Sequence, residues 1–578
     1  MEEHKDRASS SISIALIGSG GAGVMTAGSM LLEAAGRAGL FGIMTRSAGP
    51  QIRGGEAAAM LRLATFPVES HDNEFDILLA IDWLNADRFR AEIPLGTQSL
   101  IIGETDAEPP QAFTDSGART LELPLKQIAR ETDGGRENMV VLGVVCSLIG
   151  LPLEPLHQVL ESLLKRKGQA AIDSSVACVD SGAAHTGKHQ GSYQLSLSSE
   201  KQCDLWNISG NEAAGLGAIR GGVRFVAAYP ITPATELLEW MAPALEQVGG
   251  ILVQAEDELA SVNQLIGASF GGTPSLTATS GPGLALMTES IGLAVASETP
   301  IVVVDVMRGG PSTGIPTKSE QSDLNIAIYG LHGDAPHLVL APMSVADCLF
   351  TTQWAIHLAE KLQTAAIVLS DQNLGQTRAI IERPADVAFV SGRSIQETPM
   401  EGYQRYAVGG NGVSPMALPG TAGCQYTADG LEHAPSGIPS SRAEDHRQQL
   451  DKRRDKLVNH DYGDHWALIE GEGEFAVITW GSSLAPVREA RAMLLSDGID
   501  IRIIAPRLLL PVQPERMQQA LAGVTGALVV EQSHGAQFFH YLQAFYPQKF
   551  EFMSMAQPGP LPIRPEQVVA DIKTRGKY

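Results

Sequence analysis

The sequence predicts a multidomain α/β protein with three successive α/β blocks. Short apolar runs alternate with helical patterns along most of the 578 residues, which is typical of parallel sheets covered by helices. Glycine is frequent, at 60 residues, as in proteins with many tight strand-to-helix turns. A chain of this length accommodates about three to five domains of roughly 100–200 residues each.

The composition excludes several classes of protein. Hydrophobic residues make up 44% and charged residues 19%, so the chain is not wholly disordered. A net charge of −23 disfavours nucleic-acid binding. The five cysteines form no CxxC motif, which excludes a ferredoxin-type cluster held by this chain. Because no signal peptide or apolar stretch of membrane-spanning length is visible, we expect a soluble, cytoplasmic protein without membrane contact.

The first block, residues 1–170, is expected to form one domain with a parallel sheet. A strand over residues 12–17 leads into a glycine-rich turn and a helix that ends near residue 38. Further strands are predicted over residues 77–81 and 100–102, and two helices over 139–164, broken near Pro152. Residues 171–206 are rich in Ser, Gly, His and Gln and are predicted to be an interdomain linker.

The rest of the chain divides into two further blocks with a connecting segment. In the second block, residues 207–384, the expected elements are a helix over 212–220 and strands over 225–228, 251–254, 275–279, 301–306, 338–340 and 366–369. Residues 385–472 predict an irregular segment with one solvated, mixed-charge helix over 442–456. In the third block, residues 473–578, the expected strands are 475–480, 499–504 and 527–531, with a helix after 485.

The glycine-rich turn of the first block has the pattern Gly18-x-Gly20-x-x-Gly23, with a further glycine at Gly21. Backbone N–H groups at such a turn, together with the helix dipole, suit a phosphate. The acidic residue that holds a dinucleotide ribose about 20 residues further on is absent. The turn therefore indicates either a phosphate-bearing ligand other than NAD or a tight turn without a ligand. Arg53 lies in a second glycine-rich stretch nearby.

Three residues of the second block stand where strands end and helices begin. Thr232 lies between Pro230 and Pro233 and is expected to cap a helix whose first residue is Pro233; its hydroxyl also emerges where α/β folds bind ligands. Glu258 precedes an expected apolar helix stripe of Leu259, Val262, Ile266 and Phe270. It is a proton-transfer candidate if its carboxylate points inward; the alternative is that the acidic residues here only complement the helix dipole. Arg308 precedes two glycines and is either a carboxylate-binding or a surface arginine.

These motifs together resemble a known family. The strings GSGGAGVMTAG at residues 18–28 and RGGEAAA at 53–59 are followed by GNEAAGLGAIRGGVRFVAAYPITPATE at 210–236. QAEDELASVNQLIGASFGG, TSGPG and MRGGPSTG come next, in the family's order. The chain resembles, over nearly its whole length, the alpha subunit of 2-oxoacid:acceptor (ferredoxin) oxidoreductases with a gamma domain fused at the N-terminus.

The resemblance implies a fold and a chemistry. The three blocks would be a Rossmann-like gamma domain, a thiamine diphosphate-binding domain of the pyrimidine type and a transketolase C-terminal-like domain. A 2-oxoacid would be decarboxylated on thiamine diphosphate, its acyl group passed to coenzyme A and its electrons sent through an iron–sulfur cluster to ferredoxin. Some members run this reaction in reverse and fix CO₂.

The resemblance also assigns residues. Glu258 matches the glutamate that hydrogen-bonds the aminopyrimidine ring, Thr232 a threonine near the reacting carbonyl, and Arg308 the arginine that holds the substrate carboxylate. Ile231 is expected to contact the cofactor. The residues expected to bind coenzyme A are Gly18, Gly20, Gly21, Gly23 and Arg53.

The resemblance also explains two missing features. The chain has neither the GDG motif with a downstream Asn that holds Mg²⁺ and the diphosphate nor a cysteine cluster. A separate beta subunit is therefore expected to supply both, in a dimer of heterodimers. The layout is most similar to the 2-oxoglutarate enzymes, with pyruvate and branched-chain 2-oxoacids left open. Two other readings are a non-catalytic coenzyme A-binding scaffold and an unrelated acyl-CoA ligase or transferase.

Overall fold

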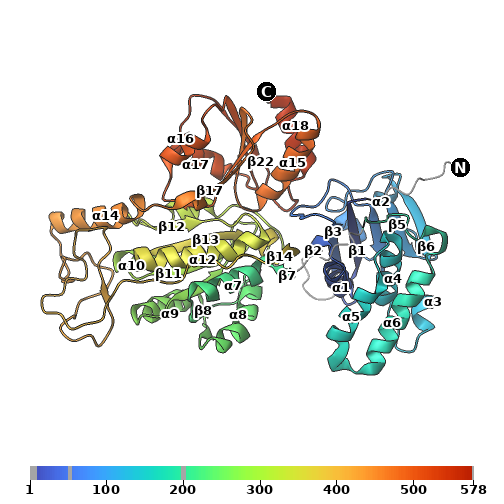
Figure 1. Cartoon of the computed structure of the whole chain (residues 1–578), viewed down its shortest axis with the longest axis horizontal. Coiled ribbons are helices and arrows are strands. Elements are labelled where there is room, and N and C mark those ends of the chain that lie inside the picture. Colours follow the sequence, from blue (N-terminus) through green and yellow to red (C-terminus); the bar gives the residue numbers. More distant parts are fainter. Residues whose placement is uncertain (1–8, 50–54, 197–203, 576–578) are drawn as a thin grey trace. The chain divides into compact units, whose positions relative to one another are not determined.

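The computed structural model describes residues 9–49, 55–196 and 204–575, and the chain forms two compact units (Figure 1). The first unit comprises residues 1–209 and 377–385, and the second comprises 210–376 and 386–578. None of the helices in the described part of the chain combines the length and apolar character that a membrane span requires.

The first unit is built on an eight-stranded sheet with the order β6-β5-β4-β1-β3-β2-β14-β7. Its strands are β1 Ser11–Ser19, β2 Phe41–Ala48, β3 Glu56–Ala64, β4 Ile77–Ala80, β5 Leu100–Glu104, β6 Arg119–Leu123, β7 Leu205–Ser209 and β14 Arg378–Glu382. The half formed by β1, β4, β5 and β6 is parallel, as predicted. The other half is antiparallel, so the wholly parallel sheet expected for this block is wrong.

The antiparallel half was missed because its strands lack a clear apolar run. Strand β2 carries the polar residues Thr45, Arg46 and Ser47 before its last residue, and β3 is interrupted by Arg62 and has alanine at four of its nine positions. Strands β7 and β14 come from residues assigned to the predicted linker and to the second block. Their burial against β2 and against each other was therefore invisible in the local sequence pattern.

The helices of the first unit pack on this sheet around a large apolar core. They are α1 Val24–Arg37, α2 Gln111–Thr114, α3 Leu125–Arg130, α4 Glu137–Ile149, α5 Leu153–Leu164 and α6 Gln169–Ala184. The break between α4 and α5 falls at Gly150–Pro152, as predicted.

Helix α6 corrects the predicted linker over residues 171–206. It packs against α4 so closely that a Cβ at Gly143 would collide with the carbonyl oxygen of Val179, and a Cβ at Gly182 with that of Val140. The two backbones approach each other because small residues line the crossing. A helix rich in Ala, Ser and Gly carries little hydrophobic periodicity, which is why its composition resembled a linker.

The second unit contains a seven-stranded sheet with the order β20-β12-β13-β11-β10-β8-β9. Its strands are β8 Phe225–Ala228, β9 Ile251–Gln254, β10 Ser275–Thr279, β11 Ile301–Met307, β12 Leu338–Leu340, β13 Ala365–Asp371 and β20 Leu508–Leu510. The helices connecting them are α7 Gly210–Gly221, α8 Thr235–Gln247, α9 Glu258–Phe270, α10 Gly281–Ala296, α11 Leu324–Tyr329, α12 Val345–Leu362 and α13 Gln372–Gln376. All pairs are parallel except β12 with β20, so the predicted parallel sheet is confirmed.

A smaller five-stranded sheet, also in the second unit, has the order β17-β19-β18-β21-β22. Its strands are β17 Ala467–Glu470, β18 Phe475–Thr479, β19 Arg502–Pro506, β21 Gly526–Glu531 and β22 Phe552–Ala556, and its helices are α15 Leu484–Ser496, α16 Pro514–Ala520, α17 Gln537–Phe545 and α18 Pro565–Arg575. This confirms a third α/β block. Because β20 from the same stretch of chain pairs with β12, the block is joined to the larger sheet.

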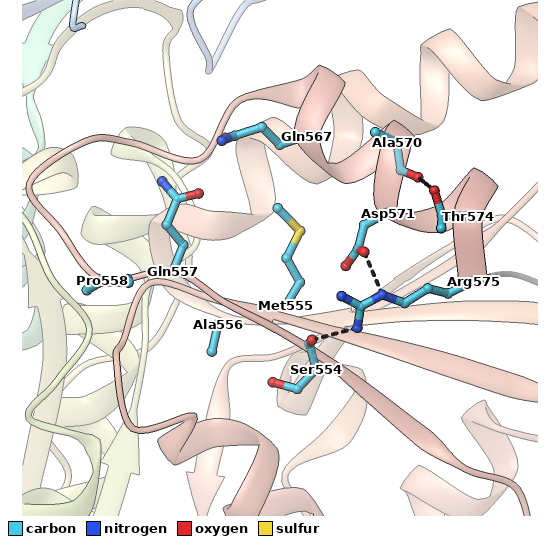
Figure 2. A pocket seen from close by; sticks show the side chains of 10 residues that line it. All are labelled: Ser554, Met555, Ala556, Gln557, Pro558, Gln567, Ala570, Asp571, Thr574 and Arg575. Carbon is cyan, nitrogen blue, oxygen red and sulfur yellow. Dashed lines mark hydrogen bonds and ion pairs between the residues drawn. The ribbon is translucent and has the colours of Figure 1, made fainter.

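One backbone carbonyl group of the edge strand β22 is hydrogen-bonded to a side chain. The Arg575 guanidinium donates to the carbonyl oxygen of Ser554 at 3.2 Å and pairs with Asp571 at 2.7 Å (Figure 2). A cation bound to an edge carbonyl hinders pairing with another strand. The cavity of about 490 Å³ beside β22 is therefore bordered by a strand whose Ser554 carbonyl oxygen already has a hydrogen-bond donor.

The segment 385–472 is largely irregular, as predicted, with short strands β15 Ile395–Gln396 and β16 Met416–Ala417 and the helix α14 Ala443–Val458. The prediction that this helix is solvated is wrong. Lys452 and Lys456 are buried and donate to the two carboxylate oxygens of Glu298 at 2.8 and 3.1 Å. Burial alone raises the pKa of Glu298, but Lys456 and Lys452 outweigh it and lower that pKa to about 2.

Candidate active site

The residues singled out in the second block gather at the carboxyl edge of the larger sheet. Thr232 follows β8, Glu258 follows β9, and Arg308 follows β11 directly. Ligands of open α/β sheets bind at this edge, because the loops from neighbouring parallel strands converge there. The architecture therefore assembles one candidate site from turns that are separated by up to 76 residues in the sequence.

Arg308 and Thr232 are in direct contact. The Nη1 atom of Arg308 donates to the carbonyl oxygen of Thr232 at 2.6 Å. Arg308 is only 6% exposed, and its buried Nε has no hydrogen-bond acceptor among the described residues. The sequence-based alternative of a surface arginine is thus wrong. A buried guanidinium with a free donor suits the binding of a carboxylate.

The expectation that Thr232 caps a helix with Pro233 as its first residue is wrong. Helix α8 begins at Thr235, after a cis peptide bond between Thr232 and Pro233, and no side chain caps it. The backbone N–H of Thr235 donates to the carbonyl oxygen of Ile231 at 3.1 Å, which closes a turn around the three intervening residues. The Thr232 hydroxyl is therefore not used by the helix, and both Ile231 and Thr232 are half-buried in this turn.

Glu258 is the first residue of α9 and points inward, as predicted. The preceding Asp257 caps the helix by accepting from the Ala260 N–H at 2.7 Å. Glu258 is 7% exposed, and its Oε1 lies 2.9 Å from the place that a Cβ at Gly283 would occupy. The glycine thus leaves room for the carboxyl group beside the turn that follows β10.

The apolar stripe expected along α9 is shifted by one position. The buried residues are Glu258, Ser261, Val262, Leu265 and Ser269. Leu259, expected in the core, is 48% exposed. Because residues four and seven positions apart share a helix face, Glu258 lies on the same face as Val262 and Leu265, and this face packs inward.

Two buried carboxyl groups next to this site were missed by the sequence interpretation. Asp305 lies in β11, in register with Thr279 of β10; it is fully buried, and neither carboxylate oxygen has a partner among the described residues. Asp323 precedes α11, and its carboxyl oxygens approach Gly281 so closely that a Cβ there would clash. An acidic residue inside the run Ile301–Met307 was the available signal, since buried strands rarely carry a charge.

The two carboxyl groups and Arg308 influence one another electrostatically. Burial, and then the neighbouring Asp323, raise the pKa of Asp305 well above its ordinary value. Burial and Glu320 raise the pKa of Asp323 to about 7, while Arg308 opposes this shift. Burial lowers the pKa of Arg308, and Asp323 partly restores it. Asp323 is therefore the carboxyl group that balances the buried arginine.

The glycine-rich turn of the first unit connects β1 to α1, as predicted. Gly21 and Gly23 have φ angles of +102° and +85°, which favour glycine. Ser19 donates from both its N–H and its hydroxyl to the Asp82 carboxylate, at 2.9 and 2.7 Å. Gly18 belongs to β1, and Gly20 donates to the carbonyl oxygen of Gly55. Arg53 lies outside the described residues.

A cavity of about 680 Å³ opens beside this turn. Gly21 and Gly23 line it, whereas Gly18 and Gly20 do not. Four exposed basic residues also line it, namely Lys126, Arg130, Arg136 and Lys167. They come from α3, from the loop before α4 and from the short 3₁₀ turn Lys165–Lys167 after α5, so no motif in the sequence connected them with the turn. Together they favour a ligand with several negative charges.

Comparison with known proteins defines the class of this site. Residues 216–452 match the family model described as pyruvate flavodoxin/ferredoxin oxidoreductase, thiamine diphosphate-binding. Residues 13–185 match the model described as pyruvate ferredoxin/flavodoxin oxidoreductase. The fold and the site are therefore those of a thiamine diphosphate-dependent oxidoreductase subunit.

Individual relatives define the family. The chain is 37% identical over 338 residues to the 2-oxoglutarate synthase subunit KorA of Methanothermobacter marburgensis, covering 57% of this chain and 89% of that protein. It is 31% identical over 465 residues to the 2-oxoacid:ferredoxin oxidoreductase 2 alpha subunit of Aeropyrum pernix, covering 74% and 72%. This chain belongs to the family of 2-oxoacid:ferredoxin oxidoreductase alpha subunits.

A solved structure extends the similarity to nearly the whole chain. The 2-oxoglutarate:ferredoxin oxidoreductase of Magnetococcus marinus, with 2-oxoglutarate, coenzyme A and succinyl-CoA bound, matches with a TM-score of 0.91 and 35% identity. The match covers 98% of this chain and 99% of that one. It confirms the predicted succession of α/β folds from the first block to the third.

Proposed function

We propose that this chain is the alpha subunit of a 2-oxoglutarate:ferredoxin oxidoreductase. The complex would convert 2-oxoglutarate and coenzyme A to succinyl-CoA and CO₂ and pass two electrons to ferredoxin, reversibly. The observation that carries this substrate assignment is the 35% identity, over 98% of this chain, to the Magnetococcus marinus enzyme with 2-oxoglutarate and succinyl-CoA bound. The names of the KorA relatives agree with it.

Glu258 is the proposed proton carrier. When bound, thiamine diphosphate supplies a centre that stabilises the carbanion left by decarboxylation. The residues around Glu258 fit the pyrimidine half of this cofactor, because the carboxyl group is buried at the carboxyl edge of the larger sheet and Gly283 lets it approach the turn after β10 closely. In this role Glu258 holds a proton at a ring nitrogen of the aminopyrimidine, and Ile231 contacts the ring.

Arg308 and Thr232 are the proposed substrate-binding residues. The Arg308 guanidinium binds the carboxylate next to the keto group through donors that the protein leaves free, among them the buried Nε. The carbonyl oxygen of Thr232 orients the guanidinium through the 2.6 Å hydrogen bond that it accepts. The hydroxyl group of Thr232 is proposed to contact the keto oxygen of the substrate. Binding of the substrate carboxylate by Arg308 fixes the position of the substrate relative to Glu258 and so orients the substrate for reaction.

The cavity beside the glycine-rich turn is the proposed coenzyme A site. Its volume of about 680 Å³ lies in the range of roughly 300–1,000 Å³ that is typical of ligand pockets. Coenzyme A carries a diphosphate and a further phosphate, which match the four basic residues of the lining. Gly21 and Gly23 allow the phosphates to approach the backbone, and Gly18, Gly20 and Arg53 are retained as proposed contacts of this site.

The remaining functions are assigned to partners. A beta subunit would hold Mg²⁺, the cofactor diphosphate and the iron–sulfur cluster, since the sequence lacks both motifs, and two such heterodimers would pair. Within this chain, residues 1–170 are proposed as the coenzyme A-associated domain, to which helix α6 also belongs, and residues 207–384 as the pyrimidine-type domain. Residues 385–472 connect the pyrimidine-type domain to a C-terminal domain of residues 473–578.

The test is an activity assay of the chain purified with and without its beta subunit. Coenzyme A-dependent reduction of methyl viologen would be measured with 2-oxoglutarate, pyruvate and a branched-chain 2-oxoacid. We expect activity only in the complex and chiefly with 2-oxoglutarate. A preference for pyruvate would overturn the substrate assignment, and turnover by the chain alone would overturn the division of the active site between two subunits.

A further inference from the structure

The loop that follows Arg308 is folded back on itself. The Ile315 N–H donates to the carbonyl oxygen of Gly309 at 2.8 Å, and the Gly309 N–H donates to that of Lys318 at 3.0 Å. The tip of the loop, residues 311–316, is exposed. The base, residues 319–325, returns to the start of α11 and contains Asp323. The position of this base therefore determines where the Asp323 carboxyl group lies.

Gln321 attaches the base of the loop to the smaller sheet. It is fully buried, and its backbone N–H donates to the carbonyl oxygen of Gln532 at 2.7 Å. Its Nε2 donates to the carbonyl oxygen of Trp480, and its Oε1 accepts from the Gln532 N–H and the Ser483 hydroxyl, each at 2.8 Å. Trp480 follows β18 and Gln532 follows β21, so one side chain joins two loops at the carboxyl edge of that sheet.

Neighbouring residues of the base make contacts with the same domain. Gln537, at the start of α17, donates to the carbonyl oxygen of Ser322 and accepts from the Asn325 N–H, both at 2.8 Å. Glu320 accepts from the Gly559 N–H at 3.1 Å. The residues on both sides of Asp323 are thus held by the smaller sheet and its loops, although Asp323 itself faces the larger sheet.

Asp323 connects this anchored segment to Arg308. Its carboxyl group lies against Gly281, at the N-terminus of α10. The backbone that follows Arg308 is hydrogen-bonded to the same segment, because the Gly309 N–H donates to the carbonyl oxygen of Lys318 at 3.0 Å and the Gly310 N–H donates to the Glu320 carboxylate at 3.3 Å. Because Gln321 is two residues from Asp323, a shift of the anchored base moves the carboxyl group relative to the guanidinium. Neither Gln321 nor Asp323 is among the residues to which the resemblance assigns a role.

We propose that Gln321 and Asp323 are positioning residues that set the geometry of Arg308 for the 2-oxoacid carboxylate. The C-terminal domain thereby acts as a platform for substrate binding. This inference rests on the proposed role of Arg308 in binding the substrate.

The effect should be specific to one substrate. Loss of Gln321 leaves buried donors and acceptors without partners in two loops and frees the base of the Arg308 loop. We expect Gln321→Ala to raise KM for 2-oxoglutarate about tenfold, which corresponds to about 1.4 kcal/mol of binding free energy. KM for coenzyme A should stay within about twofold, because the proposed coenzyme A cavity is lined by residues of the first unit and by none of this loop. The turnover number should fall much less than the 2-oxoglutarate affinity.

The experiment compares Gln321→Ala and Asp323→Asn with Gln449→Ala in the assembled complex. Gln449 is an equally buried glutamine that donates to the carbonyl oxygen of Tyr406 at 2.9 Å, away from this loop. A general loss of stability would affect Gln321→Ala and Gln449→Ala alike, whereas the proposal predicts a raised KM for 2-oxoglutarate only in the two loop variants. If Gln321→Ala does not assemble, Asp323→Asn, which keeps the side-chain shape, decides the question alone.

Arg308→Lys, measured in parallel, separates this inference from the function on which it rests. If Arg308→Lys raises KM for 2-oxoglutarate while Gln321→Ala and Asp323→Asn behave like Gln449→Ala, the positioning role is wrong and the role of Arg308 stands. If Arg308→Lys leaves KM for 2-oxoglutarate unchanged, the proposed substrate-binding role of Arg308 is itself overturned.

Discussion

The two candidate sites, one in each unit of this protein, differ in how far their charged residues are exposed. The cavity beside the glycine-rich turn is bordered by the exposed residues Lys126, Arg130, Arg136 and Lys167. At the larger sheet, in contrast, Glu258, Arg308 and Asp305 are buried, and so is the Glu298 carboxylate between two lysines of α14. Exposed charges are screened by water and salt, whereas a buried charge interacts strongly and depends on its partners.

This difference has a functional consequence. A ligand with several phosphates can be held by many weak, nearly independent contacts, so the loss of one basic side chain costs little. A proton transfer depends on one group in one position, and a buried ion pair cannot lose one member without leaving the other uncompensated. Single substitutions should therefore have large effects at the larger sheet and small ones at the cavity.

The largest effect is expected at Glu258. In the assembled complex, Glu258→Gln should lower the turnover number by about 10²–10⁴-fold, the range of general acid–base catalysis, because the amide cannot carry the proton. Affinity for the beta subunit should not change, since the two side chains have nearly the same shape. The measurement is methyl viologen reduction together with size-exclusion chromatography of the complex.

Glu256→Gln provides the matched control for this substitution. Glu256 is exposed in the same turn between β9 and α9, so its loss should leave turnover near that of the unaltered protein. A Glu258→Gln complex that retains full activity would support the reading of this chain as a non-catalytic scaffold.

The second effect concerns stability. Glu298→Gln removes the charge between Lys452 and Lys456 and should lower the free energy of unfolding by about 3–5 kcal/mol, as expected when one member of a buried ion pair is lost. Asp455→Asn, on the same helix, disrupts only an exposed pair with Arg454 and should cost about 0–1 kcal/mol. Urea unfolding of both variants measures the difference in free energy of unfolding. Equal denaturation midpoints would contradict the expectation that the buried ion pair contributes more stability than the exposed one.

The same carboxylate predicts an acid-dependent loss of stability. The pKa of Glu298 is lowered from 4.5 to about 2 in the folded protein. Its contribution is therefore fully present above pH 4.5 and is lost as the pH falls through about 2, because protonation is easier in the unfolded chain. The stability difference between the unaltered protein and Glu298→Gln should accordingly shrink as the pH falls from 4.5 towards 2.

Sequence reasoning found the part of the site that lies at strand ends. Thr232, Glu258 and Arg308 each follow a short apolar run, and such runs end at the same edge of a parallel sheet. It did not find Asp305, because one acidic residue in an apolar strand does not reveal which group it faces. It also read α14 as solvated, since the spacing of charges along a helix does not show whether their partners are water or the distant Glu298.

The cavity proposed to bind coenzyme A was predicted only in part, for a similar reason. The turn with Gly21 and Gly23 has a local pattern, but the basic residues that surround it are dispersed along the chain from Lys126 to Lys167. Exposed lysines and arginines are common on every helix surface, so only the fold identifies those that share a cavity.

The smallest effects are expected at this cavity, and they test its additive character. Arg136→Ala and Lys167→Ala should each raise KM for coenzyme A about 1.4- to 5-fold, corresponding to the 0.2–1 kcal/mol of an exposed charge pair, and the double variant should show roughly the product. The effect should diminish at high salt, because exposed charges are screened.

Arg166→Ala is the matched control, since Arg166 is exposed next to Lys167 but does not line the cavity. An unchanged KM in the double variant would show that coenzyme A binds elsewhere. A loss of a hundredfold or more from one substitution would show that this site, like the one at the larger sheet, depends on a single charged group.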